Sequence, residues 1–290
     1  MELPLHGVLV ADKPAGPTSH DVVLTIRRAL RVKVGHAGTL DPAASGVLPL
    51  LIGEATRLMR FFQSSDKEYV AAIRLGAETD TYDAQGAVTR RSEPPRLDRD
   101  QAEQILDRFR GQVAQLPPMY SAVRVAGERL YKAARRQEIR TRPYRSVEFH
   151  RLELLELCRD EWILHVHCSA GAYIRTLAFD IGRAAGCGAH LRELRRTRSG
   201  QFTLENAAPP EALVANCREH LVPMEELLPH LPRVDLHESD AHRISHGNDA
   251  ETPTDWIGTC RLFVSGRLLA IGESRNGKVH PFLVLSRGDA

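Results

Sequence analysis

The pattern of apolar and polar residues at the start of the chain predicts a strand followed by a helix. "HGVLVADKP" is typical of a short buried strand that Pro14 ends. In "AGPTSHDVVLTIRRALR", Thr18 or Ser19 is a suitable N-cap, and apolar residues follow it at helical spacing at Val22, Val23, Ile26 and Leu30. We therefore expect strand, turn and helix over the first thirty or so residues.

The next segments continue this alternation of strands and helices. "GVLPLLIG" predicts a buried strand, and "EATRLMRFFQ" predicts a short amphipathic helix. "KEYVAAIRLG" alternates apolar and polar residues, as a half-buried strand does. In "LDRDQAEQILDRFRG" we expect a helix that begins with a capping box of Asp98 and Gln101 and stops at Gly111.

Two long strands and a helix follow a basic segment. The strands are expected in "RSVEFHRLELLEL" and "EWILHVHCSA", and the helix in "AYIRTLAFDIGRAAG", closed by Gly186. Since no regular βαβ repeat is present, the pattern predicts the α+β class with a mainly antiparallel mixed sheet flanked by helices.

Proline-rich segments near residues 206–233 interrupt the pattern. Beyond them, "RLFVSGRLLAIGESRNGKVHPFLVL" shows short strands joined at glycine turns. We therefore expect two domains, 1–230 and 231–290, of which the second is a small β-barrel.

The charge distribution favours a polyanionic partner. The formal net charge is only +2, but residues 124–145 contain eight Lys or Arg against two Glu. A second basic cluster, "LRELRRTR", covers residues 191–198. The first cluster is expected to form a mostly polar helix with flexible flanks, an excursion over about residues 112–145.

Five widely spaced cysteines without a C-x-x-C pair argue against a zinc or dithiol site. The first ten residues lack a signal-peptide pattern, and no apolar run is long enough to cross a bilayer. We therefore expect a cytoplasmic protein that does not bind a membrane.

The segment "GHAGTLDPAASGVLPL" places a single carboxylate in a loop ahead of a buried strand. Pro42 favours an extended backbone at Asp41, and Gly35 and Gly38 permit positive φ or a close approach. Phosphate-loop, serine-hydrolase and zinc-protease motifs are absent from the sequence. A lone aspartate can act as a nucleophile or base if a cation from elsewhere keeps it ionised.

This loop resembles the signature of the TruB family, the tRNA pseudouridine-55 synthases. Four further segments resemble family motifs in the same order: "GVLVADKPAGPTSHDVV", "SDKEYVAAIRLGAETDTYDAQG", "GQVAQLPPMYSAVRVAGERLYKAAR" and "CSAGAYIRTLAFDIGRAAGCGAHLRELRR". The C-terminal segment is similar to the end of a PUA domain, a small RNA-binding barrel. The resemblance implies the pseudouridine synthase fold.

The resemblance also implies roles for individual residues. Asp41 corresponds to the catalytic aspartate, Tyr69 to the tyrosine that stacks on the target uracil, and Arg175 to the arginine that pairs with the aspartate. His36 corresponds to the histidine that replaces the extruded base. Lys13, Tyr173 and Leu194 correspond to other pocket positions. Contacts to RNA are expected from basic residues in the two clusters: Arg124, Arg129, Lys132, Arg135, Arg136, Arg192, Arg195 and Arg196.

The implied reaction is the isomerisation of uridine to pseudouridine in the T-arm loop of tRNA. It involves no redox change and no energy input, so no cofactor and no metal are expected. The aspartate could attack C1′, attack C6 or remove the C2′ proton, and the sequence leaves these alternatives open. The target base must first be flipped out of its stack. We expect a monomer that needs no protein partner.

Three other functions remain open at this point. The chain could be a tRNA-binding or tRNA-folding protein without chemistry, or a glycoside hydrolase with Asp41 as nucleophile, although it lacks a partner acid. It could also be a guide-RNA-directed relative within the same family.

Overall fold

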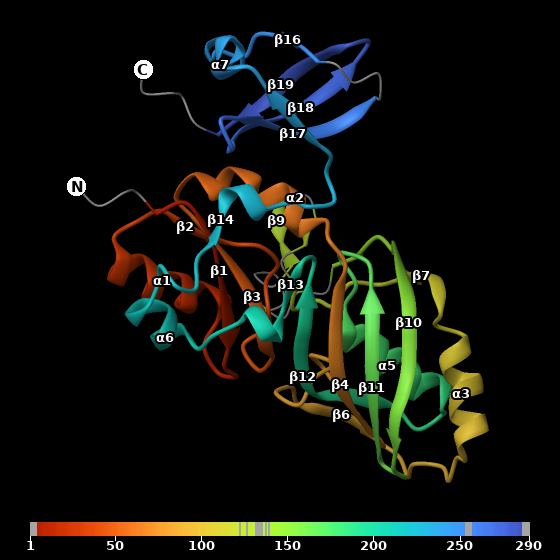
Figure 1. Ribbon diagram of the computed structural model, residues 1–290. Coiled ribbons are helices and arrows are strands. Elements are labelled where there is room, and N and C mark those ends of the chain that lie inside the picture. The colour runs from red at the N-terminus through yellow and green to blue at the C-terminus, as the bar shows by residue number, and fades with distance from the viewer. Residues whose placement is uncertain are drawn as a thin grey trace.

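The computed structural model describes residues 5–121, 123–125, 127–130, 136, 138, 140–252 and 257–285 (Figure 1). Its larger part is built on a ten-stranded sheet with the order β14-β1-β3-β12-β4-β11-β10-β7, to which β2 adds on β3 and β13 on β12. The strands are β1 (Gly7–Lys13), β2 (Val34–His36), β3 (Ser45–Ile52), β4 (Lys67–Leu75), β7 (Gly111–Gln115), β10 (Arg145–Leu157), β11 (Glu161–Cys168), β12 (Ala189–Ser199), β13 (Phe202–Thr203) and β14 (Val222–Pro223).

Within this sheet, the pairing of β12 with β3 is the one parallel pairing among the described residues. The remaining elements of this part are α1 (Ser19–Leu30), the 3-10 turn η1 (Gly53–Leu58), α2 (Met59–Gln63), β5 (Ala77–Thr79), β6 (Val88–Arg91), α3 (Arg99–Asp107), β8 (Arg124–Val125), β9 (Glu128–Arg129), α5 (Ile174–Ala184), η2 (Leu204–Asn206), α6 (Pro210–Ala215) and η3 (Met224–Glu226). The expected α+β class with a mainly antiparallel sheet is confirmed.

Local signals fix the helix starts where the sequence predicts them. Thr18 caps α1 and forms a capping box with Asp21, and Asp98 forms one with Gln101 at α3. Gly111 does not stop α3, however, because that helix ends at Asp107 and Gly111 begins β7. The predicted helix at residues 54–63 is a 3-10 turn followed by one short α-helix.

The long strands bury one face beneath helices α3 and α5 (Figure 1). On β11, Trp162, Leu164, Val166 and Cys168 are at most 1% exposed, and the residues between them are partly exposed. This period-two pattern places the core on one side of the sheet, between β4, β11 and β10 and the helix α5.

The second basic cluster lies on β12, in the middle of the sheet. It pairs with β4 on one side and β3 on the other, so its charged residues alternate between the two faces. Propensity did not predict this strand, because the four arginines from Arg192 to Arg198 and a glutamate interrupt its apolar pattern. Its placement comes from its neighbours in the sheet.

The C-terminal unit is a five-stranded sheet in the order β15-β17-β18-β19-β16 with α7 (Glu238–Ser245). Its strands are β15 (Arg233–Leu236), β16 (Ala250–Glu251), β17 (Gly258–Val264), β18 (Arg267–Arg275) and β19 (Lys278–Val284). Ser265 and Gly266, and Asn276 and Gly277, have positive φ in the two hairpin turns. Two consecutive positive φ angles are the requirement of a two-residue hairpin with a type I′ turn, which explains the glycine turns in the sequence.

This unit packs on the larger part through apolar side chains. Phe263, Leu268 and Ile271 share a buried cluster with Leu58 and Phe62. Among the described strands, β15 and β16 are the two edges of the sheet and do not pair with each other, so a closed PUA-like barrel stays a prediction. The domain boundary at residue 231 also stays a prediction. None of the described helices is long and apolar enough to span a membrane.

Candidate active site

Asp41 lies in the loop between β2 and β3, and the backbone on both sides of it is fixed by buried groups. Ser19 accepts a hydrogen bond from the Leu40 amide at 2.9 Å and donates one to the Leu40 carbonyl at 3.0 Å. On the other side, the Lys13 ammonium donates to the Pro42 carbonyl at 3.1 Å. Such contacts at both neighbours orient the Asp41 side chain before any substrate binds.

Lys13 is completely buried, not the solvated turn residue that its position before Pro14 would ordinarily give. Its ammonium also donates to the carbonyls of Pro14 and Pro17, both at 2.8 Å. Burial lowers the pKa of Lys13, and the nearby Asp41 charge counteracts this. Lys13 therefore holds the loop through its hydrogen bond to the Pro42 carbonyl and adds a positive charge near the Asp41 carboxylate.

Arg175 projects from the first turn of α5 and forms a two-point ion pair with Asp41. Its Nε lies 2.8 Å from Asp41 Oδ2, and its Nη2 donates to Oδ1 at 3.2 Å. The Arg175 side chain is 6% exposed, whereas that of Asp41 is 42% exposed. The guanidinium is thus part of the protein interior, and the carboxylate is presented to an incoming molecule.

The two terminal nitrogens of Arg175 also donate to backbone carbonyls. Nη1 donates to the Thr81 carbonyl at 3.1 Å, and Nη2 donates to the Tyr120 carbonyl at 2.9 Å. A buried charge tolerates its environment only when such partners are present. These hydrogen bonds hold the guanidinium in a single orientation toward Asp41.

Asp83 is a site residue that the sequence analysis missed. Its Oδ2 lies 3.7 Å from Arg175 Nη1, and its side chain is 15% exposed. Asp83 belongs to the segment "TDTYDAQGAV", which reads as a turn-rich connection. The sequence signal that could have found Asp83 is its place within the second family-like motif. Its proximity to Arg175 is set only by the fold.

Two opposing effects set the protonation of Asp41. Desolvation by the surrounding protein raises the pKa of Asp41 above its ordinary value, while Arg175 lowers it and Asp83 raises it further. Arg175 is therefore the main group that favours the ionised carboxylate.

Tyr69 and Arg196 form the buried wall beside this loop. Tyr69 is 8% exposed on β4, opposite Arg196 on β12. Burial raises the pKa of Tyr69 to about 12, and a hydrogen bond with Arg196 counteracts the rise. The tyrosine hydroxyl is therefore protonated at neutral pH.

Arg196 does not lie on the expected basic surface, and its assignment as an RNA contact is contradicted by its position. It is 1% exposed, and it donates to the Val47 carbonyl at 2.7 Å and to the Gly38 carbonyl at 2.9 Å. Gly46 permits this close approach of β12 to β3, since a Cβ there would lie 2.1 Å from the Arg196 carbonyl oxygen. Arg196 braces the Asp41 loop from inside the protein.

His36 ends β2, opposite Leu50 on β3. Burial and the nearby Arg196 lower the pKa of His36, so the neutral ring is favoured. Its Nδ1 is buried and finds no hydrogen-bond partner among the described residues. An unpaired buried nitrogen is costly, so it is a candidate for contact with a bound molecule.

Of the two other residues expected in the pocket, Leu194 lines it beside Asp41, whereas Tyr173 precedes α5 and is not among the lining residues. Gln115, which is 2% exposed, accepts from the Tyr173 amide at 3.0 Å and donates to the Tyr173 carbonyl at 3.2 Å. Gln115 is a second residue that the sequence analysis missed, and it fixes the start of α5. A small open pocket is lined by Asp41, Asp83, Arg175 and Leu194, together with Ala43, Ala44, Ala84, Leu191, Arg192 and Glu193.

Of the other basic residues expected to contact RNA, the structure describes the side chains of Arg136, Arg192 and Arg195. Arg192 pairs with Glu161 at 2.6 Å and Arg195 with Asp12 at 2.8 Å, and both are partly exposed. Arg136 is exposed and pairs with Glu128 and Glu138, both at 2.8 Å. The backbones of Arg124 and Arg129 form the β8–β9 hairpin. Their side chains lie outside the description, as do Lys132, Arg135 and most of the helix expected there.

Comparisons with known proteins identify the family of this chain. The sequence profile described as TruB family pseudouridylate synthase (N terminal domain) matches residues 27–174, and that of the tRNA pseudouridylate synthase B C-terminal domain matches residues 175–229. The tRNA pseudouridine synthase B of Azoarcus sp. (strain BH72) is 45% identical over 95% of this chain and 93% of its own length. That of Symbiobacterium thermophilum is 47% identical over 83% of this chain and 82% of its own length.

Solved structures give the same relationship. A chain of a Cbf5-Nop10-Gar1 complex has a TM-score of 0.76 and 30% identity, covering 97% of this chain and 86% of that one. A chain of an H/ACA RNP bound to a substrate RNA containing 2′-deoxyuridine has a TM-score of 0.75 and 29% identity, with the same coverage. The Asp41 loop, the buried arginine that meets it and the full-length similarity lead to one conclusion: this chain belongs to the TruB family of pseudouridylate synthases and has the pseudouridine synthase fold.

Proposed function

We propose that this protein isomerises uridine to pseudouridine in tRNA, with Asp41 as the catalytic group. The observation that carries the proposal is the exposed Asp41 carboxylate paired at two points with the buried Arg175 guanidinium. The pairing supplies an ionised, oriented carboxylate at the mouth of a small pocket. The tRNA pseudouridine synthase B relatives, at 45% identity over most of both chains, support the same reaction and substrate class.

We propose the following roles for the residues around Asp41. Tyr69 stacks on the flipped uracil, with its protonated hydroxyl available for the proton transfer that completes the reaction. Neutral His36 occupies the space that the flipped base leaves in the RNA, which its unpaired Nδ1 supports. The flip costs a few kcal/mol, which binding of the folded RNA must supply.

The target is proposed to be the uridine of the T-arm loop, position 55 in the family's naming. RNA loops are recognised by shape, backbone contacts and stacking, which suits a basic segment beside the pocket. We propose that the exposed Arg192 and Arg195, the hairpin residues Arg124 and Arg129, and Lys132, Arg135 and Arg136 contact this arm. The C-terminal unit is proposed to be a PUA-like RNA-binding module.

Such an enzyme is proposed to act in the cytoplasm as a monomer without a protein partner. The guide-RNA-directed alternative comes from the same family, and the solved relatives at about 30% identity include complexes with Nop10 and Gar1. Higher identity to the tRNA pseudouridine synthase B relatives favours direct recognition of tRNA.

The test uses the full chain and an unmodified tRNA transcript without added proteins or guide RNA. Carbodiimide labelling should detect one pseudouridine in the T-arm loop at unchanged RNA mass. Asp41→Asn should abolish turnover and keep RNA affinity within about tenfold, since phosphate contacts dominate affinity. The exposed Asp100→Asn is the matched control and should react like the parent.

Other outcomes separate the alternatives. RNA binding without any isomerisation would indicate a binding protein, and release of free base would indicate a hydrolase. Activity only after a guide RNA and partner proteins are added would assign the chain to the guide-directed group. Turnover of Asp41→Asn within about tenfold of the parent would rule out Asp41 as the essential group.

A further inference from the structure

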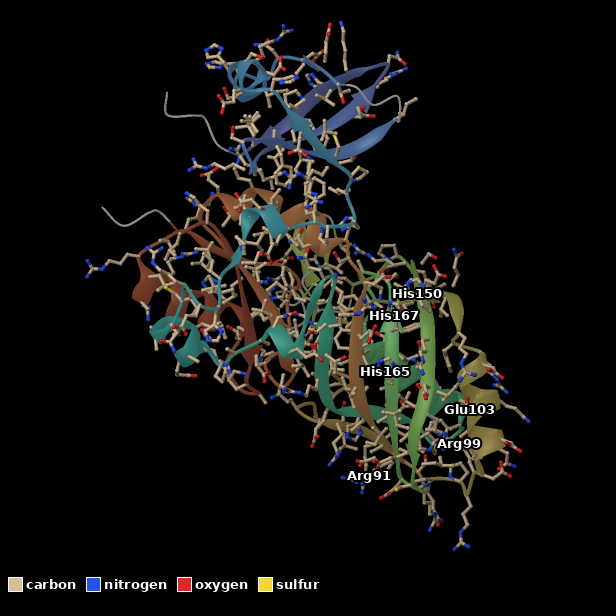
Figure 2. All side chains as sticks on the ribbon, viewed as in Figure 1. Arg91, Arg99, Glu103, His150, His165 and His167 are labelled. Carbon is tan, nitrogen blue, oxygen red and sulfur yellow. The ribbon has the colours of Figure 1, made fainter. Side chains whose placement is uncertain are left out.

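A second group of ligand-type side chains lies on the face of the sheet opposite Tyr69. It consists of Asp66, His150 and His167, whose ligand atoms all lie within 4.8 Å of one another. On β11, Val166 and Cys168 point into the core, so His167 between them points to the open face. Figure 2 shows His150 and His167 on adjacent strands at this face. The group is therefore separate from the Asp41 pocket.

The fold brings these three residues together through a bulge. His167 is on β11, and Asp66 directly precedes β4. On β10, the register shifts between Phe149 and Arg151, which leaves His150 as the extra residue. Bulges redirect a side chain, and here the imidazole is turned toward its neighbour on β11 with ring centroids 4.8 Å apart.

Two of the three distances between ligand atoms fit a tetrahedral metal site, and the third, between the two imidazoles, is at most 4.8 Å. Asp66 Oδ2 lies 3.3 Å from His150 Nε2 and 3.5 Å from His167 Nε2. Zinc bonds of about 2.0 to 2.2 Å in tetrahedral geometry place neighbouring ligand atoms about 3.3 to 3.6 Å apart. The carboxylate oxygen and each imidazole nitrogen are thus already at the spacing that zinc requires.

We propose that Asp66, His150 and His167 bind one divalent transition-metal ion, with zinc as the best match. Two imidazoles and one carboxylate suit zinc, and they leave a fourth position for water. The side chain of Asp66 is 45% exposed, that of His150 31% and that of His167 24%, so an ion can enter from solvent.

The surroundings are compatible with a bound cation. Glu148 lies 3.5 Å from His150 Nδ1, where a carboxylate can orient the ring of a metal ligand. Arg198 donates to His167 Nε2 at 3.2 Å, so this nitrogen carries the lone pair that a metal needs. Arg198 also pairs with Glu68 at 2.5 Å and can keep that partner when the metal takes its place on His167.

The ion would tie the start of β4 to β10 and β11. The metal would then stabilise this end of the three neighbouring strands. The melting temperature should rise with zinc concentration, because zinc binds the folded chain preferentially. The isomerisation itself uses no step at this ion.

The experiment titrates zinc into the full chain, carrying no histidine tag, by isothermal titration calorimetry near neutral pH. We expect one site of this type per chain, and a visible absorption band of tetrahedral character when cobalt replaces zinc. His150→Ala and Asp66→Asn should each weaken zinc binding at least about tenfold. His165→Ala is the matched control, since His165 lies on the same face of β11 and pairs with Glu68 instead, and it should bind zinc like the parent.

Magnesium is the second control, because an imidazole site discriminates against it. The proposal is overturned if zinc does not bind, if His150→Ala and Asp66→Asn bind it as the parent does, or if His165→Ala loses as much affinity as they do. It is also overturned if magnesium raises the melting temperature as much as zinc does. Circular dichroism establishes that each variant is folded before titration.

Discussion

The Arg175 guanidinium meets the Asp41 carboxylate at two points, with Nε 2.8 Å from Oδ2 and Nη2 3.2 Å from Oδ1. The two residues are 134 positions apart in the chain. They come from the first turn of α5 and from the loop ahead of β3, so the pair joins two separately positioned segments. Arg175 therefore controls both the ionisation of Asp41 and the orientation of its loop.

Removing the guanidinium tests this relationship. Arg175→Met should lower single-turnover rates a hundredfold or more, the scale of a lost active-site electrostatic contact. The pKa of Asp41 is already raised by desolvation, and it rises further without its counter-charge. The ionised fraction at a given pH then falls, so activity should recover partly as the pH is raised.

Arg175→Lys should restore only part of the rate, because a point charge cannot reproduce a planar two-point contact. Single-turnover rates of both variants on one T-arm stem-loop, measured across neutral and alkaline pH, check this. A flat pH profile at the parental rate would show that Arg175 does not act on Asp41. The exposed Arg183→Met, further along α5, is the control and should leave the rate unchanged.

Asp83 faces the same guanidinium at 3.7 Å and competes with Asp41 for it. Asp83→Asn removes the charge that raises the pKa of Asp41 while it keeps the side-chain size. We expect the activity profile to shift to lower pH, because Asp41 then ionises more readily. An unshifted profile at an unchanged rate would place Asp83 outside the site's electrostatics.

Substitutions of Tyr69 can test the role of its aromatic ring separately from the role of its hydroxyl. Tyr69→Phe keeps the stacking surface and leaves the buried Arg196 without one partner. It should bind RNA and fail to release product, while Tyr69→Leu should lose both functions. Product analysis by chromatography distinguishes bond cleavage from completed isomerisation. Equal, near-parental activity of both variants would show that Tyr69 has a purely structural role.

Ser19 positions the Asp41 loop through the backbone of Leu40. Ser19→Ala leaves the buried Leu40 amide and carbonyl unpaired, which should cost about 1 to 3 kcal/mol of stability. The turnover number should fall more than RNA affinity, since Asp41 loses its orientation and the phosphate contacts remain. Ser64→Ala, at an exposed position on the surface, is the control for both measurements. If denaturant unfolding and turnover of Ser19→Ala match that control, the loop does not depend on Ser19.

Asp180 gives a prediction on stability and pH. Burial raises the pKa of this carboxyl on α5 to about 6 from 3.8. Between these values the folded chain holds a proton that the unfolded chain releases, so this group lowers the free energy of unfolding as the pH rises through the window. Above about pH 6 the carboxyl is ionised in both states, so the loss of unfolding free energy caused by its burial no longer changes with pH.

Asp180→Asn removes that charge. It should raise the free energy of unfolding by about 1 to 2 kcal/mol at neutral pH, after allowance for partial exposure, and have little effect below the pKa of the unfolded state. Urea unfolding at neutral and acidic pH checks this. A variant that is less stable than the parent at neutral pH would show that the ionised carboxyl makes a favourable contact instead.

The sequence by itself determined the features that depend on near neighbours. Thr18 and Asp98 mark two helix starts because a capping side chain bonds an amide three residues away. The alternation on β4 and β11 sets which side chains are buried, because strand side chains have a period of two. The family-like loop also located Asp41, since a motif is a property of consecutive residues.

Only the tertiary structure decided the features that depend on distant segments. The helical pattern around Arg175 does not distinguish an exposed charge from a buried one. The family resemblance implies its pairing with Asp41, and the fold buries the guanidinium against that carboxylate. Arg196 reads as part of a basic cluster, and β12 places it inside the sheet under the Asp41 loop. Asp83 and Gln115 carry no distinctive local signal. Burial, ion pairs and desolvation are set by long-range packing, so the same arginine in a sequence can be an RNA contact or an internal brace until its neighbours in space are known.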